Sequence, residues 1–399
     1  MALADLFTDI SDAIREKDGT ADPIVANDFP ARIRDIETGY RIDLSVEPPD
    51  GGTVSGGGRA SAGMNVTVTV ADDDVENGHI FSAWQENGVD VSKARSYSFS
   101  VENHRSLTAI IKTYNLWFSK ASGGSISNFA SVTYGGGKFV AVAGRSKIAV
   151  YSTDGMRWTS STLPSLQFWN SVTYGNGKFV AVASSTGQAA YSADGIDWRT
   201  TTLPSSEKWS GVTYGGGKFI AIASGTDQAA YSTDGITWTA TTFPLSGFPL
   251  SVTYGDGKFV AIASRSSYAA YSTDGITWTK TTTGSRLGYG CVVYGDGKFV
   301  AVDYAGTKSI YSTDGITWTI SYLPFSTRWT SVAYGNGKFV AIASGTDRAA
   351  YSEDGITWGK IVMPSSGEWS SITYGDGKFV AVADEDTHTV YSKERDQTV

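Results

Sequence analysis

The stretch SVTYGGGKFV at residues 131–140 decides the fold, because close copies of it return at intervals of 40 residues. The copies read SVTYGNGKFV at 171, GVTYGGGKFI at 211, SVTYGDGKFV at 251, CVVYGDGKFV at 291, SVAYGNGKFV at 331 and SITYGDGKFV at 371. A second segment, YSTDGMRWT at 151–159, has counterparts at 191, 231, 271, 311 and 351. We number the repeats 1 to 7 by the starting residue of the first segment.

Each repeat predicts four short strands. The first (SVTYG) and second (KFVAVAS) are separated by Gly-Gly, Asn-Gly or Asp-Gly pairs, which suit two-residue hairpin turns because these residues adopt positive φ. The third (QAAYS) and fourth (ITWT) flank a turn of sequence S-T-D-G. Four strands in about 40 residues, repeated several times, are typical of β-propeller blades. The absence of a helical period excludes an α-solenoid.

The last repeat ends YSKERDQTV and lacks the DGITW segment of its fourth strand. Trp117 precedes Ser131 by 14 residues, and the tryptophans of the repeats precede the next repeat by 13. We therefore expect residues 114–120 to supply the missing strand, which removes the open edges of the ring. The sequence predicts a mainly β protein with a closed seven-bladed propeller over residues 114–399.

The S-T-D-G-I-T-W segment resembles the Asp-box of sialidase-type propellers, here one residue shorter than the usual S-x-D-x-G-x-x-W. The resemblance covers about residues 114–399, and in that family the box is structural. The side chains agree, since Ser and Asp hold turn amides and Gly accepts positive φ. We interpret the repeated aspartates as turn formers, and the alternative is carboxylates for catalysis or calcium; they are Asp154, Asp194, Asp234, Asp274, Asp314 and Asp354.

Residues 1–39 predict a short helical hairpin, with an apolar stripe from Leu3 to Ile14 and a second from Phe29 to Ile36. Fewer than about 40 residues do not bury a sufficient core, so we expect this hairpin to dock on copies of itself or on a larger assembly. The pattern LFTDISDAIREKDGTADPIVANDFPARIRDI resembles a module of phage tail and head-fibre proteins and related prophage proteins. That resemblance implies attachment to other virion proteins and a homo-oligomer, with a trimer as one possibility.

Residues 40–113 predict a small β-domain of alternating strands and Gly-rich turns. The order GGTVSGGG, then NVTVTV, then F-S-A-W-Q-E-N-G resembles the divergent internalin-type B-repeat, which implies a spacer with Trp84 in its core.

Composition excludes several classes of protein. The formal net charge is −8 with no basic block, which disfavours binding to nucleic acid or to an anionic membrane surface. Cys291 is the single cysteine, so no internal disulfide forms. The start lacks a secretory signal and no stretch has the roughly 20 apolar residues of a membrane helix, so we expect synthesis in a cytoplasm.

We expect neither an enzyme nor a cofactor or metal. Sialidase activity needs an arginine triad, a tyrosine nucleophile with a glutamate and an acid/base aspartate, and the propeller arginines show no such spacing. The three histidines His79, His104 and His388 are scattered, and Cys291 has no His nearby in sequence. The equal length of the repeats also disfavours one asymmetric catalytic cleft.

Binding is predicted at one end of the ring. The turns between strands 1 and 2 and between strands 3 and 4 hardly vary, whereas the connections between strands 2 and 3 and from strand 4 to the next repeat vary everywhere. Variation collected on one face of a rigid scaffold is typical of a recognition surface. One position there is mostly aromatic: Phe129, Trp169, Trp209, Tyr289, Trp329 and Trp369, with Pro249 interrupting the series.

These aromatic residues predict a platform for sugars or a protein partner; the alternative is that they cap the core between blades. Polar neighbours that could give direction are Lys208, Asp227, Gln228, Arg328, Asp347 and Arg348. A distinctive pocket is also predicted in the fifth repeat, where the sequence departs most, from Arg286, Tyr289, Asp303 and Tyr304.

The sequence thus favours a phage or prophage virion fibre, in the tail or head, whose propeller recognises a host surface glycan or protein. Repeated equivalent subsites would add avidity. The alternatives are a structural decoration protein without a specific ligand, a glycoside hydrolase and a bacterial surface adhesin.

Overall fold

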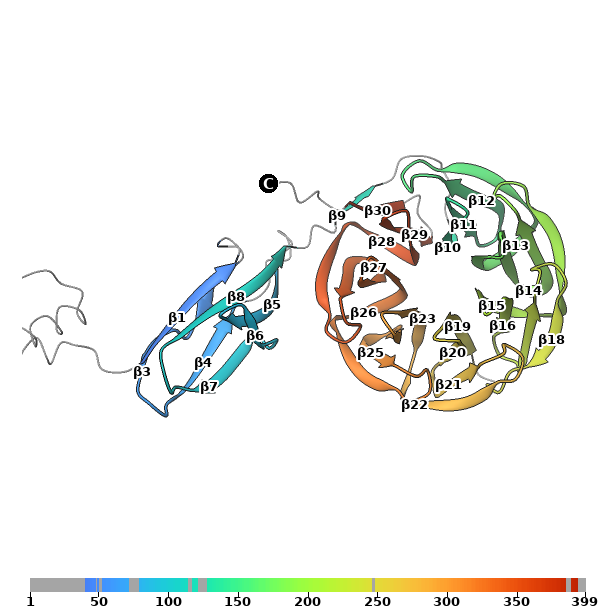
Figure 1. Ribbon diagram of the computed structural model, residues 1–399. Coiled ribbons are helices and arrows are strands. Elements are labelled where there is room, and N and C mark those ends of the chain that lie inside the picture. Colours follow the sequence, from blue (N-terminus) through green and yellow to red (C-terminus); the bar gives the residue numbers. More distant parts are fainter. Residues whose placement is uncertain are drawn as a thin grey trace, which may run out of the picture. The chain divides into compact units, whose positions relative to one another are not determined.

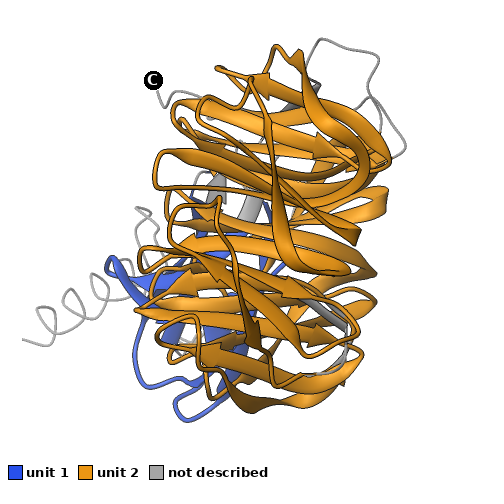
Figure 2. Ribbon diagram, turned by 90° about the vertical axis from the view of Figure 1, so that its right-hand side faces the viewer, with its two compact units in different colours: residues 1–114 blue, residues 115–399 orange. Residues whose placement is uncertain are grey.

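The computed structural model describes residues 40–47, 49, 52–71, 79–113, 117–120, 128–245, 248–384 and 389–393, and every element in these ranges is a β-strand. The chain divides into two compact units, residues 1–114 and 115–399 (Figures 1 and 2). The helical hairpin predicted for residues 1–39 lies outside the described residues.

The N-terminal unit contains two β-sheets. Its strands are β1 (Tyr40–Glu47), β2 (Val54–Ser55), β3 (Gly58–Ala60), β4 (Asn65–Val70), β5 (His79–Glu86), β6 (Val89–Ser92), β7 (Ser96–Ser100) and β8 (Arg105–Thr113). One sheet has the order β3-β1-β8-β5-β6 and the other β2-β4-β7. Their shared core contains Trp84, which is fully buried and donates its indole N–H to the carbonyl of Arg95 at 3.2 Å. The predicted core role of Trp84 is confirmed.

The C-terminal unit is a ring of antiparallel strands. Its strands are β9 (Trp117–Lys120), β10 (Phe129–Gly135), β11 (Lys138–Ala143), β12 (Ser146–Ser152), β13 (Thr159–Gly175), β14 (Lys178–Ser192), β15 (Arg199–Gly215), β16 (Lys218–Ala223), β17 (Gln228–Ser232), β18 (Thr239–Thr242), β19 (Phe248–Gly255), β20 (Lys258–Ser264), β21 (Ser266–Ser272), β22 (Thr279–Leu287), β23 (Tyr289–Gly295), β24 (Lys298–Asp303), β25 (Gly306–Ser312), β26 (Thr319–Gly335), β27 (Lys338–Ser352), β28 (Gly359–Gly375), β29 (Lys378–Asp384) and β30 (Thr389–Lys393). Figure 1 shows them around a centre, with β10, β19 and β23 toward the middle and β18 and β22 at the periphery.

The predicted strand order within a repeat is confirmed by the register. In repeat 1, β10 pairs with β11, β11 with β12, and β12 with the first half of β13, all antiparallel. The 17-residue β13 then continues as the first strand of repeat 2, which is why repeats 1 and 2 share one sheet, whereas β19–β22 of repeat 4 form a sheet of their own. The second strand, such as β11, is buried along nearly its whole length, because blades cover it on both faces.

The first and last strands of the C-terminal unit meet in the last repeat. Strand β9 pairs antiparallel with β30 in the register Val390↔Lys120 to Lys393↔Trp117. The segment upstream of the first repeat therefore supplies the outer strand of the last one, as the repeat count predicted.

Tight glycine contacts link each repeat to the next. A Cβ at Gly135 would lie 2.0 Å from Cγ of Tyr174, so the tyrosine ring of repeat 2 lies directly on this glycine. The same contact recurs around the unit, and Gly375 of the last repeat meets Tyr134 of the first in the same way. The backbone N–H of Val132 also donates to the Ser371 hydroxyl at 3.1 Å. The repeats therefore form a closed cycle of identical contacts.

Candidate functional site

The two ends of the ring differ in what their residues do. We call the end with the strand 1–2 and strand 3–4 turns the constant end, and the end with the strand 2–3 and strand 4–1 connections the loop end. Since consecutive strands are antiparallel, these pairs of connections lie at opposite ends of each repeat.

At the constant end, the repeated aspartates hold turns. The Ser272 hydroxyl donates to Oδ1 of Asp274 at 2.9 Å and accepts the N–H of Gly275 at 2.8 Å. The same Oδ1 accepts the N–H groups of Ile276 and Thr277 at 2.8 and 2.7 Å. These backbone N–H groups lower the pKa of Asp274 to about 2. Equivalent bonds occur at the other five boxes, so the interpretation of the aspartates as turn formers is confirmed.

At the loop end, the prediction of an aromatic platform is wrong for every ring that the structure describes. The side chains of Trp169, Trp209, Trp329 and Trp369 are fully buried, and Phe129 is 3% exposed. Trp209 packs with Leu203 and Ala223 between two blades and donates its indole N–H to the carbonyl of Ser205 at 3.1 Å.

The physical reason is the size of the neighbouring residues. The second strand ends in a buried alanine, as at Ala183 and Ala223, and this leaves room for an indole between the blades. The aromatic residues therefore cap the core, which was the alternative interpretation. The side chains of Tyr289 and Pro249 are not among those that the structure describes.

The polar residues predicted at the loop end form two separate groups. Lys208 and Asp227 are exposed and Gln228 half-buried; the carbonyl of Lys208 accepts the N–H of Ser224 at 2.8 Å, and Gln228 donates to Asp227 at 3.1 Å. In the second group, Arg328 is exposed and pairs in register with Ser344.

Asp347 and Arg348 complete this second group. Asp347 is half-buried, and the exposed Arg348 lies with its guanidinium 4.9 Å from the ring centre of Phe325. Each group therefore offers a cation and a carboxylate on neighbouring connections.

Sequence reasoning missed the apolar residues that are exposed at this end. Phe168 is 42% exposed and the guanidinium of Arg145 lies 4.6 Å from its ring centre, while Leu166 is 64% exposed. Phe168 directly precedes the buried Trp169. The sequence signal was the position directly before the aromatic residue. Six different residue types occupy it in the seven repeats, and only phenylalanine occurs twice: Asn128, Phe168, Lys208, Phe248, Gly288, Arg328 and Glu368.

The predicted pocket of the fifth repeat is brought together only in part. Asp303 is 4% exposed, and its Oδ1 accepts the N–H groups of Gly288 at 2.9 Å and Ala305 at 3.4 Å. Burial raises the pKa of Asp303, although these N–H groups and the charge of Lys308 act in the opposite direction. Tyr304 follows in the chain and is 43% exposed.

Arg286 lies on the same stretch of the loop end as Asp303. It is exposed and donates from Nε to the carbonyl of Arg265 at 3.0 Å. Its remaining guanidinium N–H groups face no described acceptor.

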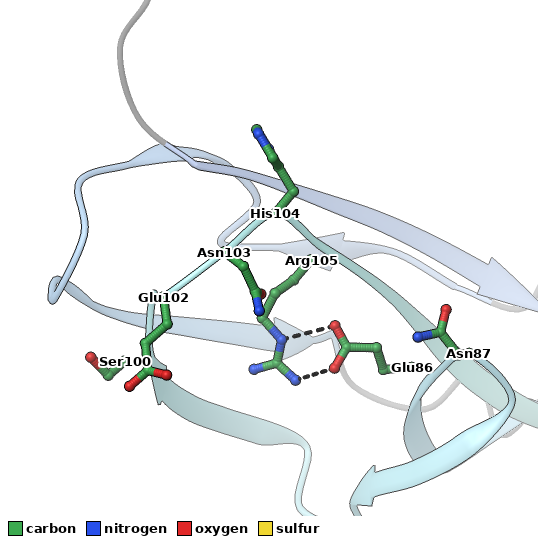
Figure 3. A pocket seen from close by; sticks show the side chains of 7 residues that line it. All are labelled: Glu86, Asn87, Ser100, Glu102, Asn103, His104 and Arg105. Atoms are coloured by element: carbon green, nitrogen blue, oxygen red, sulfur yellow. Dashed lines mark hydrogen bonds and ion pairs between the residues drawn. The ribbon is translucent and has the colours of Figure 1, made fainter.

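A polar pocket of about 380 Å³ lies in the N-terminal unit, lined by Glu86, Asn87, Ser100, Glu102, Asn103, His104 and Arg105 (Figure 3). Arg105 donates two hydrogen bonds to Glu86, at 2.6 and 3.0 Å, which lower the pKa of this carboxyl. The guanidinium also lies 4.1 Å from the ring centre of Phe99. Arg105 and Glu86 thus satisfy each other within this pocket.

Two further observations concern the described part of the chain. It contains no cluster of three or more His, Cys, Asp or Glu residues that could hold a metal ion. It also contains no helix of the length and apolarity that crossing a membrane requires.

No protein family model and no curated protein matches the chain. Among solved structures, a catalytically inactive histidine-to-alanine variant of virginiamycin B lyase from Staphylococcus aureus with quinupristin has a TM-score of 0.63 at 14% identity, and covers 69% of this chain and 99% of that one. The protein YCF48 bound to D1 peptide has a TM-score of 0.58 at 14% identity, with 71% and 97% covered.

The WD40 β-propeller domain of Doa1 has a TM-score of 0.56 at 13% identity, with 70% and 97% covered. At this level of identity, these likenesses show the fold alone. The chain contains a β-propeller.

Proposed function

We propose that this protein is a recognition protein whose propeller binds its partner through the loop end. The observation that carries the proposal is that residues at the two ends of the ring have different surroundings. Constant-end residues such as Asp274 and Gly135 are occupied by bonds and contacts that build the ring. Loop-end residues such as Phe168, Lys208 and Arg328 are exposed and differ between repeats, so they are available for a partner.

The finer architecture is part of this proposal. We infer a closed seven-bladed propeller, supported by seven repeats, by the contact between Gly375 and Tyr134, and by the pairing of β9 with β30. A closed ring gives the loop end a rigid backbone, which lowers the entropy that binding costs.

We propose a binding role without catalysis, although virginiamycin B lyase shares the fold. An inactive variant of that enzyme lacks one histidine. In residues 115–399 of this chain the single histidine is His388, which lies outside the described residues. The repeated acids Asp154 to Asp354 are held by turn amides, so they are poor candidates for a general acid and base.

We further propose that the protein is a phage or prophage virion fibre, in the tail or head, with a host surface glycan or protein as its partner. The support is the resemblance of residues 1–39 to a phage attachment module and of residues 40–113 to a spacer domain. Other virion proteins and further copies of the chain would bind the N-terminal segment. Mass spectrometry of purified virus particles tests this location. If the protein is absent from the particles, a cellular role is favoured.

Binding of the intact chain to whole bacterial cells and to arrayed surface glycans tests the recognition role. The variant Lys208→Ala with Arg328→Ala removes two exposed positive charges from the loop end and should weaken binding at least about tenfold. The matched control, Arg157→Ala with Arg199→Ala, removes two exposed positive charges near the constant end and should bind as the parent does. Equal losses in both variants would indicate a non-specific charge effect, and no binding by any form would favour a decoration protein.

A further inference from the structure

The junction between repeats 4 and 5 departs from the other junctions at its loop end. Asp303 stands where the other six repeats have a buried alanine: Ala143, Ala183, Ala223, Ala263, Ala343 and Ala383. Thr283 stands where the junctions around Trp169 and Trp209 have Leu163 and Leu203 in the core. The core of this junction is therefore polar where the others are apolar.

Gly288 leaves this polar group without a covering side chain. The equivalent position in every other repeat carries a side chain, and Gly288 has no positive φ that would require glycine. A Cβ there would lie 3.6 Å from Oδ1 of Asp303, 3.7 Å from Cβ of Tyr304 and 4.0 Å from Oγ of Ser264. A side chain would therefore fit at this position. Because glycine has none, the space between Asp303, Tyr304 and Ser264 is left open.

The carboxylate of Asp303 is incompletely satisfied. Its Oδ1 accepts two backbone N–H groups, whereas no residue in the described ranges donates to Oδ2. Oδ2 is not among the fully buried atoms that lack a partner, so this unpaired oxygen is open to solvent although the residue as a whole is 4% exposed. A hydrogen-bond donor from a ligand can therefore reach it.

The residues around Gly288 offer the contacts that sugars use. Tyr304 presents an aromatic ring that is 43% exposed, Ser264 a hydroxyl, and Arg286 guanidinium N–H groups beside the neighbouring Arg265. An aromatic face for C–H groups next to a carboxylate for hydroxyl groups suits a neutral pyranose. A sugar carboxylate placed against Asp303 would be repelled, whereas Arg286 and Lys308 would attract it, so acidic sugars are a separate class in the test.

We propose that this junction binds a neutral pyranose of a glycan, with Asp303 accepting a hydrogen bond from a sugar hydroxyl and Tyr304 covering the C–H face of the ring. The site rests on the proposed recognition role of the loop end and assigns it a ligand class. It also replaces the ring of tryptophans as the sugar-binding feature of the propeller.

Three variants of the full chain test the site. Asp303→Ala restores the alanine of six repeats, and Gly288→Phe introduces the residue found at Phe168 and Phe248, so both variants should keep the thermal unfolding temperature of the parent. Arg157→Ala is the control, since it changes an exposed residue at the constant end of the ring. The probe is an array of immobilised glycans ending in neutral hexoses, N-acetylhexosamines or acidic sugars.

The proposal expects the parent to bind neutral glycans, Asp303→Ala and Gly288→Phe to bind them at least about tenfold more weakly, and Arg157→Ala to bind within about twofold. Undiminished binding by Asp303→Ala overturns the site and leaves the recognition role standing. The same holds if the parent binds intact cells but only acidic glycans or none on the array. If the parent binds neither cells nor glycans, the site and the recognition role both fail.

Discussion

Single glycines set the spacing of the repeats. In each first strand, the glycine that follows the tyrosine receives the tyrosine ring of the next repeat, and the backbone and the ring approach as closely as a missing Cβ allows. The sequence shows Tyr-Gly in every repeat but does not show which tyrosine meets which glycine. That pairing depends on the packing of whole blades.

Gly215→Ala should destabilise the ring. Its Cβ would lie 2.0 Å from Cγ of Tyr254, so the ring of Tyr254 must move in a fully packed interface, at a cost of about 1–3 kcal/mol. Thermal unfolding followed by circular dichroism measures the effect. Gly288→Ala is the control, since its Cβ meets no atom closer than 3.6 Å, and it should unfold as the parent does. Equal stability of both variants would contradict the close Gly–Tyr packing.

The buried tryptophans show where sequence reasoning about single residues stops. A repeated aromatic residue in a variable loop is compatible with an exposed platform and with a core cap. The small residues opposite Trp169 and Trp209, Ala183 and Ala223, favour the cap, but their proximity follows only from the register of β13 with β14 and of β15 with β16. Asp274 was easier to interpret, because its partners lie within three residues along the chain.

At the scale of elements, the Asp-box turns should make the ring sensitive to acid. Folding lowers the pKa of Asp274 to about 2, so its stabilisation is complete above the unfolded value near 4 and is lost as the pH falls toward 2. The boxes at Asp154, Asp194, Asp234, Asp314 and Asp354 shift in the same direction. The unfolding temperature of the ring should therefore fall between pH 4 and pH 2.

Asp274→Asn isolates the contribution of one box. The amide cannot gain a proton in this range, so the variant should lose less stability between pH 4 and pH 2 than the parent loses. A pH profile of unfolding temperatures measures the difference. Identical slopes would show that the acid sensitivity arises elsewhere.

Strand β9 should be needed for a stable ring. Its pairing with β30 supplies the outer edge of the last repeat, and its loss leaves an unpaired edge. A chain that starts at residue 114 should keep the unfolding transition of the ring, and one that starts at residue 121 should unfold at a lower temperature and aggregate. If both truncated chains unfold alike, closure by β9 contributes little.

At the scale of the whole molecule, the repeat determined most of what could be predicted. Near-identical 40-residue units without insertions imply equal blades, and the missing last strand implied the pairing of β9 with β30. The loop end could be located but not interpreted in detail, because exposure depends on neighbours from two repeats. Gly288 illustrates this, since its importance arises from Asp303, Tyr304 and Ser264, which surround it only in the folded ring.

Hydrogen exchange of the intact chain, with and without the cell-surface fraction that it binds, tests the recognition role of the loop end most directly. The account predicts slower exchange on binding in loop-end peptides such as 164–170, 204–210, 284–290 and 303–308, and unchanged exchange in the turns at 135–138 and 153–157. Protection centred on those constant-end turns, with the loop-end peptides unaffected, would contradict it.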